Sequence, residues 1–342
     1  VEGNMTVTRD EFYKIYKEKF EPVLLPLEPG RKALAKKGAM LLIIGIIINA
    51  VAFLLSDYIS ILPFLSMGLS VVAIFWYKKN MDKYRAELKK SVMSKILSLF
   101  GNIYFSGKRN LIRLNTIKNF GLFRSASAKT DDDIVIGLYN GCNFLINECL
   151  MTHSEGSGKH SRTITDFRGF IFQVSMNKPF SGRTIVGVNG DIDKLPGFEE
   201  VKLESVEFMK GRKIYATDQI EARYILTTSF MERFDNLGKS FFESRVESNI
   251  SASGIDSGTN PVRNDNSFVG RQFAAMLERS TRVSAAFIGG YAYIFVPCSE
   301  NLFDVDMTST LLNPEAYYNI YNQLSAILEI IDYMKLNQKI GL

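Results

Sequence analysis

The residues that most suggest chemistry lie in one glycine-rich segment. Gly156-Ser157-Gly158-Lys159-His160-Ser161 looks like part of a loop that cradles phosphates. The complete pattern needs Gly at position 153 and Ser or Thr at position 160, and both positions are histidine. The segment also lies between two predicted strands, so no helix N-terminus would point at a phosphate. We therefore predict a solvent-exposed hairpin turn.

The other candidates for chemistry are also weak. The two histidines of the chain, His153 and His160, flank that loop at a spacing that is not typical of metal ligands. Asp131-Asp132-Asp133 could hold a hard cation, but a polar turn before a strand is the simpler interpretation. The three cysteines have no CxxC spacing, and no GxSxG motif occurs. The sequence therefore predicts no catalytic residue, no metal site and no cofactor.

The strongest pattern in the chain is a pair of apolar runs near the N-terminus. Residues 38–56 and 58–77 carry no charge, and Asp57 alone separates them. A helix needs about 20 apolar residues to cross the hydrocarbon core of a bilayer. We therefore predict a transmembrane helical hairpin within residues 31–78. A hairpin buried in a soluble protein is the alternative, but helices of such cores usually have shorter apolar runs.

Basic residues flank these runs on one side only. The connection Ser56-Asp57-Tyr58 has no basic residue, whereas basic residues precede the first run and follow the second. The positive-inside rule then places both termini of a multi-pass membrane protein in the cytoplasm. The residues predicted at the membrane interface are Arg31, Lys32, Lys36, Lys37, Trp76, Tyr77, Lys78, Lys79, Lys83 and Arg85.

Small and polar residues inside the runs indicate how two helices could pair. Gly45 and Gly68 would allow a close approach of the helix backbones. Asn49 is the one strongly polar side chain in mid-span, and it could bond to the partner helix, to another copy of the chain or to a local backbone group.

Helical patterns also flank the hairpin. In residues 1–30, Thr8 and Glu11 form a capping-box pattern, and Phe12, Tyr16 and Phe20 recur every four residues. That aromatic face could pack on the rest of the chain, lie in the membrane interface or meet another protein. Residues 79–101 predict a basic amphipathic helix continuous with the second run, which could pack on its own domain, lie on a bilayer or bind partners.

Composition is that of a folded protein with a basic membrane flank. Apolar residues make up 46% of the chain and charged residues 23%, with a formal net charge of +5. Residues 1–100 hold 15 Lys+Arg and 9 Asp+Glu, so the rest holds 41 − 15 = 26 and 36 − 9 = 27. Because the basic excess lies beside the apolar runs and not along the remainder, we predict a lipid bilayer as partner and no nucleic acid.

Residues 102–342 predict a cytoplasmic α+β domain with an antiparallel sheet and flanking helices, with two lobes dividing near residues 190–210 as one possibility. The expected strands are residues 134–138, 144–148, 162–176, 183–188, 201–207 and 213–216, with a hairpin over residues 283–296. Expected helices cover residues 220–226 and 229–237 and begin again at Pro314. Residues 248–266 read as a loop.

Several segments are similar to a bacterial family of two-span inner-membrane proteins with a cytoplasmic domain of unknown function. They are Gly121-Leu122-Phe123 with residues 132–137, residues 167–172 with 177–184, residues 217–226 with 230–233, and residues 302–306 with the helix through Asp332. The resemblance covers most of the chain in order, but residues 250–280 depart from the family pattern. It implies a membrane-bound assembly, because relatives are associated with a small membrane-anchored helical family (LemA-like). It implies no catalytic residues.

We therefore expect a membrane-anchored binding or scaffolding module, acting as a homo-oligomer or with another membrane protein. The alternative is a membrane-associated enzyme for a lipid or nucleotide, with acids near Asp131 or Asp218 as candidate groups. Asp218 is more simply interpreted as the N-cap of the helix that follows it.

Overall fold

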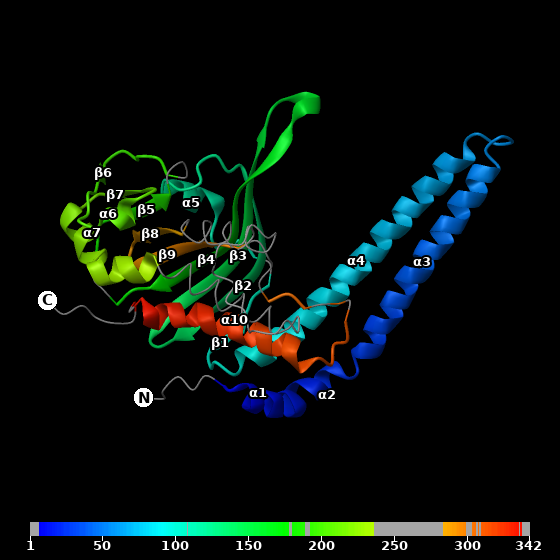
Figure 1. The fold of residues 1–342 in the computed structure, drawn as a ribbon, viewed down its shortest axis with the longest axis horizontal. Coiled ribbons are helices and arrows are strands. Elements are labelled where there is room, and N and C mark those ends of the chain that lie inside the picture. The colour runs from blue at the N-terminus through cyan, green and yellow to red at the C-terminus, as the bar shows by residue number, and fades with distance from the viewer. Residues whose placement is uncertain are drawn as a thin grey trace, which may run out of the picture. The chain divides into compact units, whose positions relative to one another are not determined.

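The protein divides into two compact units in this computed structural model (Figure 1). The structure describes residues 7–107, 109–177, 180–188, 192–235, 283–298, 303–305, 307, 309–334 and 336. The first unit comprises Val1–Leu99 and Asp304–Ile320, and the second comprises Phe100–Phe303 and Tyr321–Leu342. The last helix, α10 (Pro314–Tyr333), begins in the first unit and ends in the second. The predicted loop at residues 248–266 lies outside the described residues, as does the segment 250–280.

The first unit is helical. It contains α1 (Arg9–Ile15), the π-helical turn η1 (Tyr16–Phe20), α2 (Glu21–Leu24), α3 (Glu28–Leu54) and α4 (Leu62–Leu97). The capping box is confirmed: Thr8 accepts a bond from the backbone N–H of Glu11, whose carboxylate accepts one from the Thr8 N–H. Pro22 and Pro29 occupy the first turns of α2 and α3, where proline is tolerated.

The aromatic face of the N-terminal segment packs inside this unit. Phe12, Tyr16 and Phe20 are all buried. The rings of Tyr16 and Tyr317 stack at 5.8 Å between centroids, and those of Phe12 and Tyr318 lie 5.3 Å apart. Of the alternatives that the sequence left open for this face, the structure shows packing on the chain itself, against residues that are adjacent only in space.

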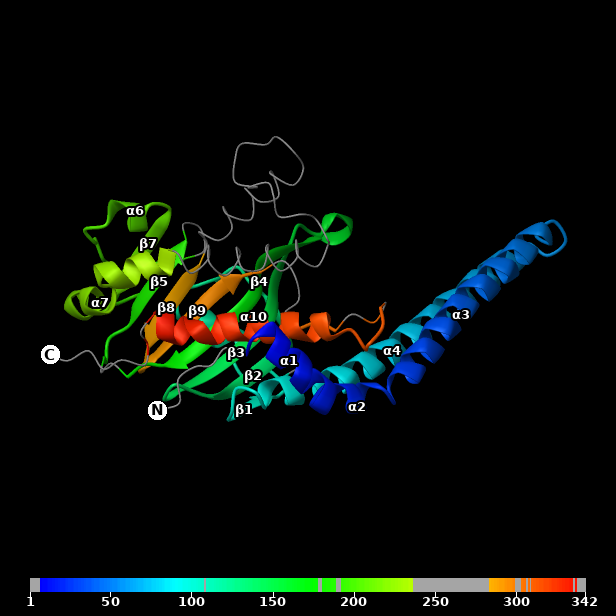
Figure 2. The same ribbon diagram turned by 60° about the horizontal axis from the view of Figure 1, so that its bottom comes forward.

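The two long helices run antiparallel and side by side, as both views show (Figures 1 and 2). A turn over residues 55–61 joins them. The continuity predicted for the second helix is confirmed, because α4 is unbroken from Leu62 to Leu97. Its far part is amphipathic as expected, with Leu88, Val92 and Ile96 buried. We call α3 and α4 together the helix pair.

The second unit is built on one antiparallel sheet, in the order β1-β2-β3-β4-β9-β8-β5-β7-β6. The long strands are β2 (Ala128–Tyr139), β3 (Cys142–Glu155), β4 (Arg162–Ser175) and β9 (Tyr291–Pro297). The shorter ones are β1 (Ile103–Phe105), β5 (Thr184–Val188), β6 (Glu199–Glu200), β7 (Arg212–Ala216) and β8 (Ser284–Ile288). The short helices are α5 (Leu114–Asn119), α6 (Val206–Met209) and α7 (Gln219–Ile225), with a 3-10 turn η2 at Gly158–His160. The α+β class with an antiparallel sheet is confirmed.

The two faces of the sheet are covered differently. On one face, Ile171 and Phe295 belong to a core cluster with the segment after β1, which contributes Ile117, Phe120 and Phe123. The other face carries Phe170 and Phe172, and the part of α10 that belongs to this unit, from Tyr321 onward, lies across it in both ribbon views (Figures 1 and 2). Paired strand residues share a face, so this alternation follows from the register of β4 with β9.

Two local predictions were wrong. Residues 201–207 form no long strand: β6 ends at Glu200 and α6 begins at Val206, with the Ser205 hydroxyl accepting a bond from the N–H of Phe208. Residues 131–133 are not a turn before a strand. They lie inside β2, where the pairing with β3 shifts between Asp131 and Ile134 in a β-bulge.

Candidate functional site

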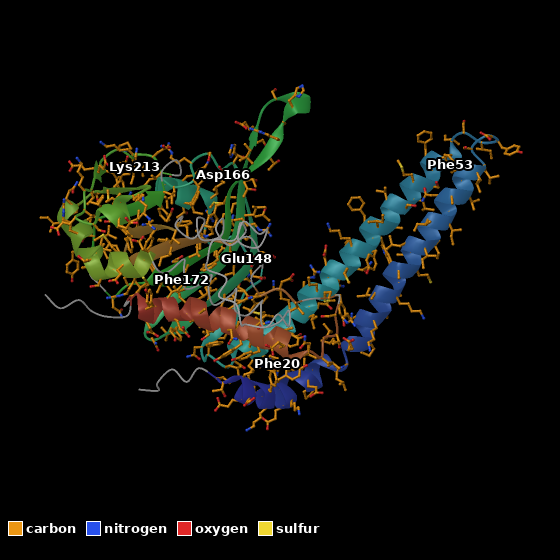
Figure 3. The ribbon with its side chains drawn as sticks, viewed as in Figure 1. Phe20, Phe53, Glu148, Asp166, Phe172 and Lys213 are labelled. Carbon is orange, nitrogen blue, oxygen red and sulfur yellow. The ribbon has the colours of Figure 1, made fainter. Side chains whose placement is uncertain are left out.

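The surface that stands out is the apolar exterior of the helix pair. Large apolar side chains are exposed from Met40 on α3 to Trp76 on α4, and Phe53 is 72% exposed. Figure 3 shows Phe53 near the turn between the helices, among side chains that project away from the pair. Soluble proteins rarely expose an apolar surface of this extent. By length and hydropathy, α3 is the one helix among the described residues that could span a membrane, with a mean hydropathy of 2.2 over 18 residues.

A polar bridge joins the two helices in mid-run. The Asn49 amide nitrogen donates to Ser70 Oγ at 2.8 Å, and Ser66 Oγ donates to Asn49 Oδ1 at 3.0 Å. The same nitrogen also donates to the Gly45 carbonyl at 2.7 Å. Asn49 therefore makes both the bond to the partner helix and the local backbone bond that the sequence left open. All of its polar atoms are satisfied within the pair, as an apolar environment requires.

Glycine contacts fix the register of the helices. A Cβ at Gly38 would lie 2.5 Å from the Tyr77 hydroxyl oxygen, and one at Gly30 would lie 3.0 Å from that of Tyr84. These two glycines allow tyrosine rings of α4 to pack directly on α3. Of the glycines singled out from sequence, Gly45 would meet Ser70 Oγ at 3.7 Å, whereas Gly68 has nothing within 4 Å. Gly38 and Gly30 are the close contacts that sequence reasoning missed.

Seven of the ten predicted interface residues are exposed. They are Lys32, Lys36, Lys37, Trp76, Lys78, Lys79 and Lys83. Tyr77 is half-buried and packs on Gly38, and Arg85 is also half-buried. Arg31 is buried at 8% exposure, which the sequence did not indicate.

Arg31 is held by Glu28. The Arg31 Nη2 and Nε atoms lie 2.8 Å and 3.0 Å from the two Glu28 carboxylate oxygens, and Arg31 Nη1 donates to the Met307 carbonyl at 3.2 Å. Glu28 also accepts a bond from the backbone N–H of Leu311. The Arg31 bonds lower the pKa of Glu28 to about 2, with the Leu311 bond adding to the effect. This ion pair connects the N-terminal end of α3 to residues 304–320, the later segment of the chain that belongs to the same unit.

One end of the core-bearing face of the sheet is partly exposed and carries no charged side chain. The strand register places ten of its residues in two neighbouring rows. The first row crosses β1, β2, β3, β4 and β9 in that order and contains Tyr104, Ile136, Leu145, Gln173 and Tyr293. The second row crosses β2, β3, β4, β9 and β8 and contains Leu138, Asn143, Ser175, Tyr291 and Ile288. We call these ten residues the uncharged face. Tyr104 is 64% exposed and Leu138 45%. The core cluster covers the same side of the sheet further along, at Ile171 and Phe295.

The acids of β2 are engaged with their neighbours. Lys129 Nζ contacts Asp131 and lies 2.9 Å from Asn147 Oδ1, and both charged side chains of this pair are buried. Asp132, Asp133 and Glu148 place carboxylate oxygens within 4.8 Å of one another, a donor set that suits a hard cation. Asp218 caps α7 by accepting bonds from the N–H groups of Ile220 and Glu221, as the simpler interpretation had it.

The glycine-rich segment forms the predicted hairpin turn between β3 and β4. The histidines have separate surroundings: His153 Nδ1 lies 2.8 Å from Asp166 Oδ1, and His160 lies in the turn. The three cysteines, Cys142, Cys149 and Cys298, are all buried thiols. Burial raises the pKa of Cys149 to about 12, so its thiol is unreactive at neutral pH.

Comparison with known proteins finds a domain of unknown function in the later part of the chain. A family model described as a protein of unknown function (DUF3137) matches residues 165–255 and 266–336, which include most of β4 and all of β8, β9 and α10. No curated protein sequence matches the chain. Among solved structures, it is similar to the mycobacterial trehalose monomycolate transport factor A, TtfA, with 8% identity, 74% of this chain and 96% of that chain covered, and a TM-score of 0.30. That TM-score is too low to establish a shared fold. The expected domain of unknown function is confirmed: the chain carries a DUF3137 domain.

Proposed function

We propose that this protein is a membrane-anchored binding or scaffolding module of a bacterial inner-membrane assembly. In this proposal α3 and α4 cross the bilayer as a hairpin, and the sheet unit lies in the cytoplasm and binds a protein partner. The observation that carries the proposal is the contrast in burial within one chain: apolar side chains of the sheet unit form a buried core, whereas those of the helix pair are exposed from Met40 to Trp76.

The contacts between the helices support a crossing by both. α4 has a shorter apolar stretch than α3, because it begins at Leu62 and reaches Lys78 after Tyr77. The Asn49 bridge to Ser66 and Ser70 places this stretch beside the apolar run of α3. If α3 enters the hydrocarbon, the helix packed along it enters as well, and every side-chain polar group at the bridge already has a partner.

Extraction from membranes tests the anchor. We expect the full chain to stay with the membrane in alkaline carbonate and to dissolve only with detergent. A chain with Ile43→Lys and Leu69→Lys, both on the exposed apolar surface, should lose this retention, because a charge at the centre of a span costs about 3 kcal/mol. Release of the unmodified chain by carbonate alone would contradict the anchor.

The uncharged face supports a binding role for the sheet unit. Its ten positions contain no Asp, Glu, Lys or Arg, and Tyr104 and Leu138 are exposed there. Interface cores are depleted in charge and enriched in aromatic residues such as tyrosine. Because an uncharged surface is complemented by another uncharged surface, we assign the face to a partner protein that presents an apolar, uncharged segment. The acids considered for a membrane enzyme do not strengthen that alternative, since Asp131 is paired with Lys129 and Asp218 caps α7.

Site-specific photo-crosslinking in intact cells tests the binding face. A photo-reactive residue at Leu138 should give one discrete cross-linked species, and Tyr104→Lys should remove it. The matched controls are Val206 and Ile220, which are 83% and 82% exposed on α6 and α7 of the same unit. A species of twice the chain mass would identify the partner as a second copy. Equal cross-linking from all of these positions, or none from Leu138, would contradict the assignment.

A further inference from the structure

The basic residues of α3 and α4 lie at one level of the helix pair. Tyr77 packs on Gly38 and Tyr84 packs on Gly30, so these two contacts bracket the intervening turns of both helices. Because the helices are antiparallel, each step toward the N-terminus of α3 matches a step toward the C-terminus of α4. Lys37 is therefore level with Lys78, Lys36 with Lys79, and Lys32 with Lys83.

These six lysines, which we call the lysine layer, have almost no counter-charge. All six side chains are exposed. Lys32 Nζ lies 3.7 Å from Glu28, whose carboxylate is already bound by Arg31, and the other five form no ion pair with any residue that the structure describes. Asp82 is the one acidic residue within residues 32–37 and 78–83. Like charges gathered at one level of two adjacent helices repel one another unless an external anion neutralises them.

The extent of the lysine layer along the helix axes matches the thickness of the headgroup region of a bilayer, which can supply anions. Residues 32–37 of a helix span about 8 Å along its axis. The headgroup region adds about 5–8 Å to each side of the hydrocarbon core. The layer begins where the exposed apolar surface of the pair ends, between Trp76 and Lys78.

We propose that the lysine layer binds anionic phospholipid headgroups and so enriches these lipids around the helix pair. This inference rests on the proposed membrane crossing and goes beyond it, because a hairpin could cross a bilayer without selecting any lipid. The layer recognises negatively charged headgroups by multivalent attraction. Phosphatidylcholine, whose headgroup has no net charge, gains nothing from it.

Trp76, the one tryptophan of the chain, is placed to report on this selection. It is 57% exposed and lies two residues before Lys78. The full-length protein would be reconstituted in bilayers of phosphatidylcholine with one-fifth phosphatidylglycerol. In two matched preparations, only one of the two lipids carries brominated acyl chains, which quench tryptophan on contact. We expect brominated phosphatidylglycerol to quench Trp76 at least about twofold beyond its mole fraction, and this excess to vanish in 1 M salt.

Variants separate the layer from charge in general. A variant that combines four changes should abolish the excess quenching by phosphatidylglycerol; the changes are Lys36→Gln, Lys37→Gln, Lys78→Gln and Lys79→Gln. The four Lys→Arg changes at the same positions should retain that excess quenching. Four Lys→Gln changes at exposed positions of the sheet unit, Lys194, Lys202, Lys210 and Lys213, are the matched control and should leave it unchanged.

The possible failures can be told apart. Quenching of the unmodified protein in proportion to mole fraction would overturn the lipid inference and leave the membrane crossing intact. No quenching by either lipid would contradict the crossing itself. Binding of a single-stranded RNA by the detergent-solubilised protein, lost with the four Lys→Gln changes, would assign the layer to nucleic acid and overturn the lipid inference.

Discussion

Asn49 shows how one polar side chain can be placed in an apolar helix without an unsatisfied group. Its amide bonds to Ser70, Ser66 and the Gly45 carbonyl. We predict that Asn49→Leu lowers the free energy of unfolding by about 1–2 kcal/mol, since side-chain bonds between helices in bilayers contribute about 0.6 kcal/mol each and up to about 2. Denaturation of the protein in mixed micelles measures it. Asn80→Leu is the control and should change stability little, because the Asn80 amide donates to the Trp76 carbonyl on its own helix and to no other described residue.

Removal of the Glu28 carboxylate should be costly to the first unit. Glu28→Gln removes the carboxylate that binds the buried Arg31 guanidinium through two bonds, and breaking a buried pair in this way costs about 3–5 kcal/mol. Lys32→Gln removes only an exposed partner at 3.7 Å and should cost less than about 1 kcal/mol. Unfolding curves of the two variants, compared at neutral pH, distinguish these contributions. Equal effects would mean that the Arg31 pair is not the stabilising contact.

The same carboxylate predicts a pH dependence. The pKa of Glu28 falls from an ordinary value of 4.5 to about 2 in the folded protein, mainly through its bonds from Arg31. A lowered folded pKa gives stability that is fully present above the unfolded pKa and is lost as pH falls through the folded one. The stability difference between the native protein and Glu28→Gln should therefore shrink between pH 4.5 and pH 2. A difference that stays constant over this interval would refute the assignment.

At the scale of elements, close packing of α3 on α4 depends on Gly38. A Cβ there would fall 2.5 Å from the Tyr77 hydroxyl oxygen, so Gly38→Ala should displace the Tyr77 ring from α3 and cost about 1–3 kcal/mol. Gly68→Ala is the matched control on α4, because nothing lies within 4 Å of its Cβ and alanine is the better helix former. We expect the first change to lower thermal stability in detergent and the second to leave it unchanged or raise it. The opposite order would mean that the helices do not pack through Gly38.

Periodicity predicts elements well and their partners poorly. The turn at Gly289-Gly290 and the helix that begins at Pro314 were predictable, because turn residues and apolar spacing are local signals. The strand predicted for residues 201–207 was wrong, because apolar residues that follow the short β6 resemble a strand pattern. In the structure Ser205 instead caps α6. The bulge at residues 131–133 depends on register with β3, which no local pattern encodes.

The residues predicted at the membrane interface also show that a sequence pattern does not reveal tertiary contacts. Exposure of the lysines follows from their charge, and sequence alone predicted it for Lys36 and Lys79. Burial of Arg31 was not predicted, although Glu28 three residues earlier is a recognisable pairing signal. What completes that site is the Leu311 backbone, which lies far away in the sequence. Contacts of this kind arise only from tertiary folding, so a sequence pattern cannot specify them.

For the whole molecule, the decisive feature is that the chain returns to its first unit. Residues 304–320 join Val1–Leu99 through Tyr317, Tyr318 and the Glu28 bonds. The prediction for residues 102–342, a cytoplasmic α+β domain with two lobes divided near residues 190–210 as one possibility, did not include this return. A truncation that removes the N-terminal segment would therefore expose Tyr317, whose burial in the intact chain raises its pKa. Because such a truncation would also disturb the packing of the first unit, point substitutions are the better probes of the proposed membrane anchor.

The proposed crossing fixes which parts of the chain face outward, and this can be tested in intact cells. The three native cysteines are buried, so a new cysteine at an exposed position should dominate labelling by a thiol reagent. Asp57→Cys lies in the turn between α3 and α4, and Lys90→Cys lies on α4 beyond the lysine layer. A membrane-impermeant maleimide should label Asp57→Cys in whole cells and label Lys90→Cys only after the cells are opened. Labelling of Lys90→Cys from outside would invert the orientation, and equal labelling of both in whole cells would mean that no bilayer separates them.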